Sequence, residues 1–213
     1  LTIDGGAYIS GTSSIEIRAG KLTVNSGTFD STGEFAVTEN GNGSTTSGVD
    51  IAICQPSTGH SLTAEINGGS FNGLRNVYAS AYGSNTNVSV KVNRGTYTDA
   101  SAFDYLNDNA SVSLGWDLTI EKPIAVTADD VTFNLGRYDI TAPSCDVFDV
   151  TGSLTVNGNY DAVIYAGSNQ SETGSVCAVW AHGSGSAVLN GGYYKVGPDK
   201  DGNRNDCIYA GSS

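Results

Sequence analysis

The sequence is poor in basic residues and has no long apolar run. Lys and Arg together number 10 against 22 Asp and Glu, which gives a formal net charge of −12. Binding to phosphates requires clustered Lys and Arg, so this balance argues against a nucleic-acid partner and against an anionic membrane surface. No stretch of 18 consecutive apolar residues occurs, so no transmembrane helix or other membrane insertion is expected.

Cysteine is also scarce, and its spacing carries no metal signature. The four cysteines form no CxxC pair and have no His at zinc-ligand spacing, so a structural metal framework is not expected. We expect stacked or buried free thiols, because a free Cys behaves as a small hydrophobe. The alternative is a disulfide of an exported protein, whose connectivity cannot be read from the sequence. The residues concerned are Cys54, Cys145, Cys177 and Cys207.

The chain contains no methionine, and it opens at Leu1 without a basic-then-apolar signal segment. We interpret it as a processed or excised piece of a longer polypeptide.

Glycine, with 28 residues, and abundant Thr, Ser, Asn and Val favour strands and turns over helices. No sustained apolar stripe of helical period occurs. The segment from Asp99 to Asn107 is the one place where a turn or a short helix is expected.

One phrase, apolar-x-apolar-Asn-x-Gly-x-aromatic, recurs seven times with small variations. It begins at Leu1, Leu22, Ala64, Val90, Val131, Leu154 and Ala187. The alternating apolar residues predict one buried face of a strand, and Asn and Gly predict a corner before the aromatic residue turns inward. The successive intervals are 21, 42, 26, 41, 23 and 33 residues, and insertions in polar stretches lengthen some of them. A period in the low twenties, with doubled intervals, is typical of a solenoid whose coils contain about 20 to 26 residues. The predicted fold class is therefore all-β, a right-handed parallel β-helix.

Equivalent positions in such a stack lie one above the next, so two ladders are predicted. The amide ladder comprises Asn25, Asn67, Asn93, Asn134, Asn157 and Asn190. The buried aromatic stack comprises Tyr8, Phe29, Phe71, Tyr97, Tyr138, Tyr160 and Tyr194. Both ladders are interpreted as scaffold.

Residues 111–141 read differently, as four short apolar runs divided by the turns GWD, EKP, TADD and NLGR. In their order of phrases they resemble the opening coils of pectate-lyase-like β-helix modules of gut-bacterial surface proteins and of phage fibres and tailspikes. The phrases VDIAI, TAEINGGSFNG, NVYAS and AVLNGGYYKVGPDKDGNRNDCIYAG resemble those modules too. The resemblance covers nearly the whole chain and implies the fold alone. It suggests one unit at 1–110 and a second at 111–213, both incomplete at their outer ends; the alternative is one continuous helix.

No catalytic residue is assigned. The calcium-ligand and basic-residue signatures of the lyases are absent from the sequence. A glycosidase needs two carboxylates flanking a bond, and Asp146 with Asp149 or Asp129 with Asp130 could supply them. In a chain with 22 acidic residues such pairs also arise by chance. His60 and His182 lie in Gly- and Ser-rich segments and are expected to be exposed loop residues.

The only cofactor that the sequence suggests is Ca²⁺. The segment PDKDGNRND offers hard oxygen ligands at Asp199, Asp201, Asn203 and Asp206. The alternative interpretation is a polar turn between strands, and the Gly positions of the known calcium loops are not matched.

Ligand binding is expected in the loops between the repeated phrases, since loops on a rigid scaffold usually carry recognition. Tyr82 and Trp116 are the aromatic residues expected to be exposed there. Trp180 and Tyr165 fit inward strand positions and are expected in the core.

The leading hypothesis is a non-catalytic module of an adhesin or phage fibre that binds a host-surface glycan. It would act outside the cell, on a cell surface or virion, beside other segments of the same fibre or as a homotrimer. The alternatives are a tailspike-type polysaccharide lyase or hydrolase, and an inert structural shaft.

Overall fold

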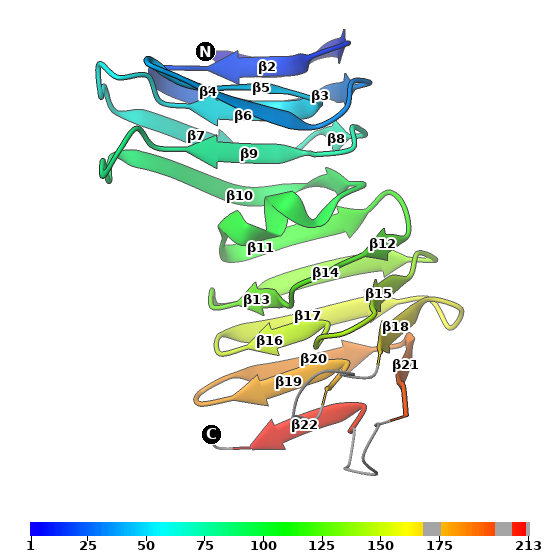
Figure 1. Cartoon of the computed structure of the whole chain (residues 1–213). Helices are drawn as coiled ribbons and strands as arrows, with labels where there is room; N and C mark the ends of the chain where they lie inside the picture. The colour runs from blue at the N-terminus through cyan, green and yellow to red at the C-terminus, as the bar shows by residue number, and fades with distance from the viewer. Residues whose placement is uncertain (168–175, 199–205, 212–213) are drawn as a thin grey trace. The chain divides into compact units, whose positions relative to one another are not determined.

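The computed structural model describes residues 1–167, 176–198 and 206–211. Within these residues the protein consists of strands and turns with a single 3₁₀ helix, so the all-β prediction is confirmed. The chain divides into two compact units, Leu1–Tyr105 (unit 1) and Leu106–Ser213 (unit 2). In Figure 1 unit 1 runs from blue to green and unit 2 from green to red. No helix of the described residues is long and apolar enough to cross a membrane.

Unit 1 alternates between two parallel sheets. The first sheet contains long strands, β1 (Thr2–Ser10), β3 (Gly20–Ser31) and β10 (Val88–Tyr97), with the shorter β7 (Leu62–Ile66) and β8 (Ser70–Phe71) between β3 and β10. The second contains β2 (Ser13–Ile17), β6 (Val49–Cys54) and β9 (Val77–Ser80). Strands β7 and β8 lie on either side of an Asn-Gly-Gly corner. Both pair with β3 and β10, so these four strands close a ring of pairings.

Two elements depart from this pattern in unit 1. Strands β4 (Ala36–Asn40) and β5 (Gly43–Ser47) form an antiparallel hairpin inserted between β3 and β6. The 3₁₀ helix η1 (Ala100–Tyr105) lies within the segment in which the sequence predicts a short helix.

The corner glycines and the aromatic residues that follow them build the core of unit 1. Phe29, Phe71 and Tyr97 are fully buried. The rings of Tyr8, Phe29, Phe71 and Tyr97 stack with centroid separations of 5.1, 5.0 and 4.9 Å. Gly69 has a φ of +115°, and a Cβ there would lie 3.2 Å from the Phe71 ring. Glycine is therefore needed both for the backbone turn and for the ring beside it.

The chain of unit 2 passes through three parallel sheets in the same order four times. The first sheet contains β11 (Leu106–Leu114), β14 (Val131–Gly136), β17 (Ser153–Gly158) and β20 (Ser186–Asn190). The second contains β12 (Leu118–Thr119), β15 (Ile140–Ala142), β18 (Val163–Ala166) and β21 (Tyr193–Val196). The third contains β13 (Ile124–Val126), β16 (Phe148–Val150), β19 (Val179–His182) and β22 (Ile208–Gly211).

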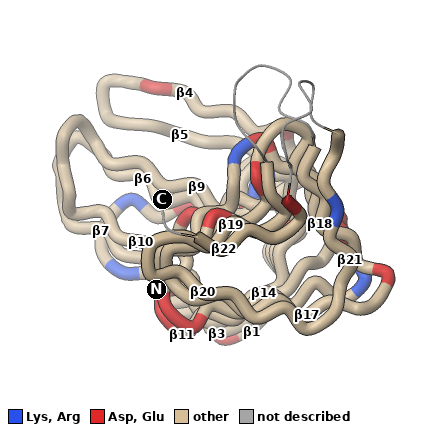
Figure 2. Tube along the Cα trace, turned by 90° about the horizontal axis from the view of Figure 1, so that it is seen from below, with Lys and Arg blue, Asp and Glu red and all other residues tan. Residues whose placement is uncertain are grey.

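Strands of the same sheet overlie one another when unit 2 is viewed along the stacking direction (Figure 2). Apolar residues alternate along each strand, as in Val131, Phe133 and Leu135 of β14, and these three are fully buried. The residues between them point outward. The strands of the first three levels therefore give one face to the core and one to the surface, while β20, β21 and β22 of the last level contain no buried residue.

The predicted amide ladder is confirmed within both units. In unit 1 the Nδ2 of Asn67 donates to the Oδ1 of Asn25, and the Nδ2 of Asn93 donates to the Oδ1 of Asn67. In unit 2 Asn157 donates to Asn134 and Asn190 donates to Asn157, each at 3.0 Å.

The predicted aromatic stack holds in unit 1 but is wrong for Tyr138 and Tyr160 in unit 2. Strands β14 and β17 end at Gly136 and Gly158, before the aromatic residue is reached. The buried Leu135 occupies the core position after Asn134. Tyr138 and Tyr160 therefore lie in the turns, and Tyr160 is 91% exposed.

Three further predictions about single side chains are wrong. His182 lies at the end of β19 rather than in an exposed loop, and its side chain is mostly buried. Trp180 and Tyr165 take the outward positions of β19 and β18, because the core positions beside them belong to residues such as Ala181 and Ile164. The four cysteines are free thiols, as predicted; Cys54 and Cys177 are buried, Cys145 is half-buried and Cys207 is exposed.

Candidate functional site

Three turns of unit 2 carry an aromatic residue followed directly by aspartate. Trp116-Asp117 lies between β11 and β12, Tyr138-Asp139 between β14 and β15, and Tyr160-Asp161 between β17 and β18. The aromatic residues are separated by 22 residues each, at positions 116, 138 and 160. All three turns connect the first sheet of unit 2 to the second, so they lie along the same edge. We call this set the aromatic edge.

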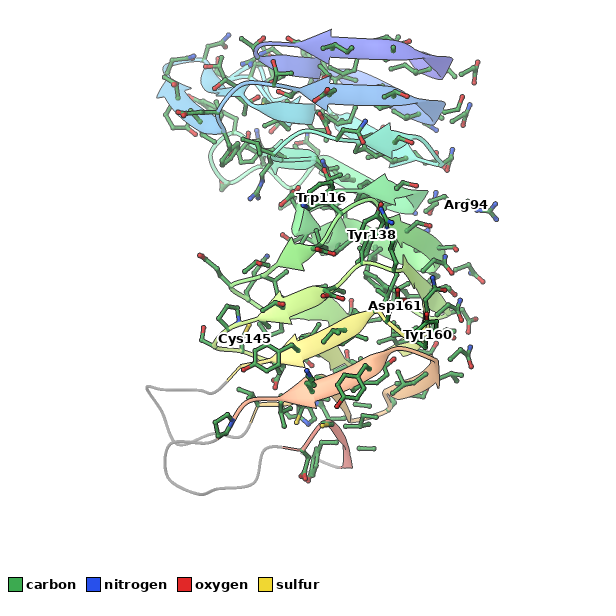
Figure 3. All side chains as sticks on the ribbon, turned by 90° about the vertical axis from the view of Figure 1, so that its right-hand side faces the viewer. Arg94, Trp116, Tyr138, Cys145, Tyr160 and Asp161 are labelled. Atoms are coloured by element: carbon green, nitrogen blue, oxygen red, sulfur yellow. The ribbon has the colours of Figure 1, made fainter. Side chains whose placement is uncertain are left out.

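The aromatic edge continues at the next turn with Tyr193, which opens β21. Trp116 is 66% exposed, Tyr160 91% and Tyr193 55%, while Tyr138 is half-buried. Figure 3 shows Trp116, Tyr138 and Tyr160 in descending order on the side of unit 2 that carries the second sheet. Four aromatic rings are thus offered to solvent at successive levels of the stack.

Backbone hydrogen bonds to aspartate hold these turns in place. The Oδ1 of Asp117 accepts the backbone N–H of Asp139 at 3.0 Å, and the Oδ1 of Asp139 accepts that of Val163 at 2.7 Å. Each aspartate thereby ties its own turn to the next level of the stack. The second carboxylate oxygen of each residue is not used in these two bonds.

A shallow open pocket of about 250 Å³ lies at the upper end of the edge, lined by Trp116, Asp117, Arg137 and Tyr138. The guanidinium carbon of Arg137 lies 5.5 Å from the centre of the Tyr138 ring. The pocket therefore combines two aromatic surfaces with one carboxylate and one guanidinium group. Such a set binds an uncharged polyhydroxylated ring well, since apolar faces pack on the rings and charged groups bond to the hydroxyls.

The outward face of the second sheet extends this surface. Thr141, Tyr165 and Lys195 lie side by side on β15, β18 and β21. The Nζ of Lys195 lies 5.0 Å from the centre of the Tyr193 ring. Aromatic and hydrogen-bonding groups therefore continue from the turns onto the neighbouring sheet.

The two aromatic residues predicted to bind ligand lie in different units. Trp116 belongs to the aromatic edge. Tyr82 lies in a loop of unit 1, where its backbone N–H bonds to the buried Gln55 at 3.0 Å, and its side chain is 38% exposed. The aromatic edge includes no residue of that loop.

The two carboxylate pairs that the sequence offers for catalysis, Asp129 with Asp130 and Asp146 with Asp149, lie in different turns and strands of unit 2. Asp129 and Asp130 lie in the turn before β14, where Asp130 has a φ of +57° and donates its N–H to Ser153. Asp149 bonds to His182, and Asp146 accepts the N–H of Cys177.

Of the proposed calcium ligands, Asp199, Asp201 and Asn203 lie outside the described residues, and Asp206 is exposed just before β22. Within the described part of the chain no three His, Cys, Asp or Glu side chains are grouped as metal ligands.

Sequence reasoning missed most of the aromatic edge because it placed Tyr138 and Tyr160 in the core. A usable signal was present. In unit 2 the aromatic residue is followed by Asp at a regular 22-residue spacing, starting at Trp116, whose phrase contains no Asn-x-Gly corner.

Comparisons with protein-family models, with curated proteins and with solved structures found no match to this chain.

Proposed function

We propose that both units are coils of a right-handed parallel β-helix, and that the chain is a non-catalytic module that binds a glycan through the aromatic edge of unit 2. The fold proposal is supported by the parallel pairing of strands with equivalent strands of the next level, from which only the β4–β5 hairpin departs among the described residues. As in other solenoids, such stacking places equivalent side chains in straight rows.

The succession of aromatic residues at the turns between the first and second sheets, one at each level of unit 2, is the observation that carries the functional proposal. Successive levels of parallel strands are about 4.8 Å apart, which is close to the rise of a sugar ring in an extended polysaccharide. Trp116, Tyr138, Tyr160 and Tyr193 would each contact one ring of a chain that runs along the stacking direction. Asp117, Asp139 and Arg137 would bond to the hydroxyl groups.

The charge of the chain favours a neutral glycan over an acidic one. The net charge is −12, and the three turns with Trp116, Tyr138 and Tyr160 each bring a carboxylate to the edge. An anionic polysaccharide would meet repulsion from these three carboxylates, which Arg137 and Lys195 offset only in part. A neutral host-surface or microbial polysaccharide, met outside the cell by an adhesin or a phage fibre, is the ligand class that we propose.

A glycan array of neutral and acidic oligosaccharides tests this function, followed by calorimetric titration with the strongest hit. Trp116→Ala and Tyr160→Ala should each weaken binding about tenfold, since one aromatic contact contributes about 1 kcal/mol or slightly more. Val188→Ala, an exposed apolar position on another sheet of unit 2, is the matched control and should bind normally.

Two outcomes would contradict the proposal. Binding to no glycan on the array would favour the inert shaft. Release of new reducing ends from the bound polysaccharide would favour the hydrolase or lyase alternative.

A further inference from the structure

The third sheet of unit 2 carries a second group of aromatic and acidic side chains on its outward face. Asp149 of β16, Trp180 of β19 and Tyr209 of β22 are direct lateral neighbours in the parallel register. They therefore lie at successive levels of the stack, about 4.8 Å apart. This face belongs to a different sheet from the aromatic edge, and none of its residues takes part in that edge.

One face of the Trp180 indole packs against the imidazole of His182. The ring of His182 stacks on it with a centroid separation of 4.1 Å and an interplanar angle of 25°. The Nε2 of His182 lies 2.8 Å from the Oδ1 of Asp149, which fixes the imidazole in turn. Trp180 remains partly exposed, and Tyr209 is 44% exposed.

A second carboxylate, that of Asp146, lies two residues before β16, the strand that carries Asp149. The Oδ1 of Asp146 accepts the backbone N–H of Cys177 at 2.5 Å, in the segment leading into β19. Burial raises the pKa of Asp146, and the nearby charge of Asp149 raises it further. Burial and the charges of Asp146 and Asp206 together raise the pKa of the Cys177 thiol to about 11. Among the described residues of this face, His182 and Asp149 form an ion pair when the imidazole is protonated.

We propose that this face binds an organic primary ammonium group, such as that of an amino sugar. An ammonium ion is attracted to the faces of Trp and Tyr rings. It would also relieve the repulsion between Asp146 and Asp149, each of which keeps one carboxylate oxygen outside the hydrogen bonds described above. Those oxygens can accept N–H bonds, which favours a primary ammonium over a quaternary one.

Titration of the ¹⁵N-labelled chain with glucosamine tests this assignment through the indole N–H signals. The chain has two tryptophans, and Trp116→Phe identifies the signal of Trp180. Glucosamine should shift the Trp180 signal in a saturable way, with a Kd of about 1 mM or tighter. N-acetylglucosamine, which has the same ring without the charge, and KCl at equal ionic strength should leave it unchanged.

Variants separate the two parts of the proposed site. Trp180→Tyr should bind glucosamine more weakly than the wild type, whereas Trp180→Leu should not bind it. Because both variants lack the Trp180 indole signal, binding is followed on the backbone amide signals. Asp149→Asn and Asp146→Asn should each weaken glucosamine binding at least several-fold. The amide signals of residues away from the substitution should match those of the wild type, which shows that the fold is intact.

Three results would overturn the assignment. These are no saturable shift with glucosamine, an equal shift with N-acetylglucosamine, or equal affinity for choline, which cannot donate to the carboxylates. The outcome is independent of the aromatic edge, because the Trp116 signal reports separately on that site.

Discussion

At the residue scale, unit 1 is organised around a buried carboxylate that the sequence does not reveal. Asp50 is fully buried and accepts hydrogen bonds from the backbone N–H groups of Ser31 and Gly73 and from the Nδ2 of Asn76. Burial raises the pKa of Asp50 to about 6 in spite of these three donors. One side chain thus links the end of β3 to the segment between β8 and β9, which belongs to the next level of unit 1.

Asp50 should make the stability of the protein depend on pH. Between about pH 4 and pH 6 the folded state holds a proton that the unfolded state, with a pKa of 3.8, has released. The unfolding free energy should therefore fall as pH rises through this window, by an amount on the order of 3 kcal/mol. Urea unfolding at several pH values measures this slope.

The matched variant for this measurement is Asp50→Asn, which cannot ionise. The difference between wild type and variant isolates the contribution of Asp50 from those of the other carboxylates. An identical slope in both proteins would contradict the account of Asp50.

The amide ladder allows a second prediction for a single residue. Asn67 accepts a hydrogen bond from Asn93 and donates one to Asn25. Asn67→Ala removes both bonds and should lower the unfolding free energy by about 1 to 3 kcal/mol. Asn72→Ala, at an exposed position outside the ladder, should change stability by less than about 0.5 kcal/mol. Comparable losses in urea unfolding would show that the ladder contributes nothing specific.

At the element scale, the repeated phrase predicts strands and corners well but predicts aromatic burial only in unit 1. There the strand continues beyond the corner, as in β3 and β10, and carries the ring inward. In unit 2 the strands end at the glycine, so Leu135 fills the core and Tyr138 is left outside. The phrase itself cannot distinguish these cases, because strand length depends on the neighbouring strands with which each one pairs.

The prediction that His182 lies in an exposed loop is wrong for the same reason. Its Gly- and Ser-rich surroundings resemble a loop, but β19 pairs with a strand on each side.

The aromatic stack of unit 1 should be most sensitive at its centre. Phe71 is fully buried between the rings of Phe29 and Tyr97, whereas Tyr8 is only half-buried and stacks on Phe29. Phe71→Ala should cost about 3 to 5 kcal/mol, and Tyr8→Ala about half as much or less. Thermal or urea unfolding compares the two, and equal losses would contradict the importance of stacking on both sides.

At the scale of the whole molecule, the two units use one repeat in different ways. Unit 1 alternates between two sheets and bends its long strands at Asn-Gly corners, while unit 2 divides each level among three short strands. The change in sequence pattern at residues 111–141 indicates this difference, since its apolar runs are short and separated by turns. The division into three strands creates the turns that expose Trp116, Tyr138 and Tyr160. The proposed binding surface is thus a consequence of the architecture of unit 2.

The central claim, that the aromatic edge contacts one sugar ring per level, is tested most directly by the dependence of affinity on glycan length. The probe is the array's strongest hit, prepared as fragments of two to six sugars and titrated by calorimetry. Affinity should rise with each added sugar up to about four, matching the four aromatic levels, and then level off. Trp116→Ala should lower that plateau. Equal affinity for the disaccharide and the hexasaccharide, or a plateau unchanged by Trp116→Ala, would contradict the account.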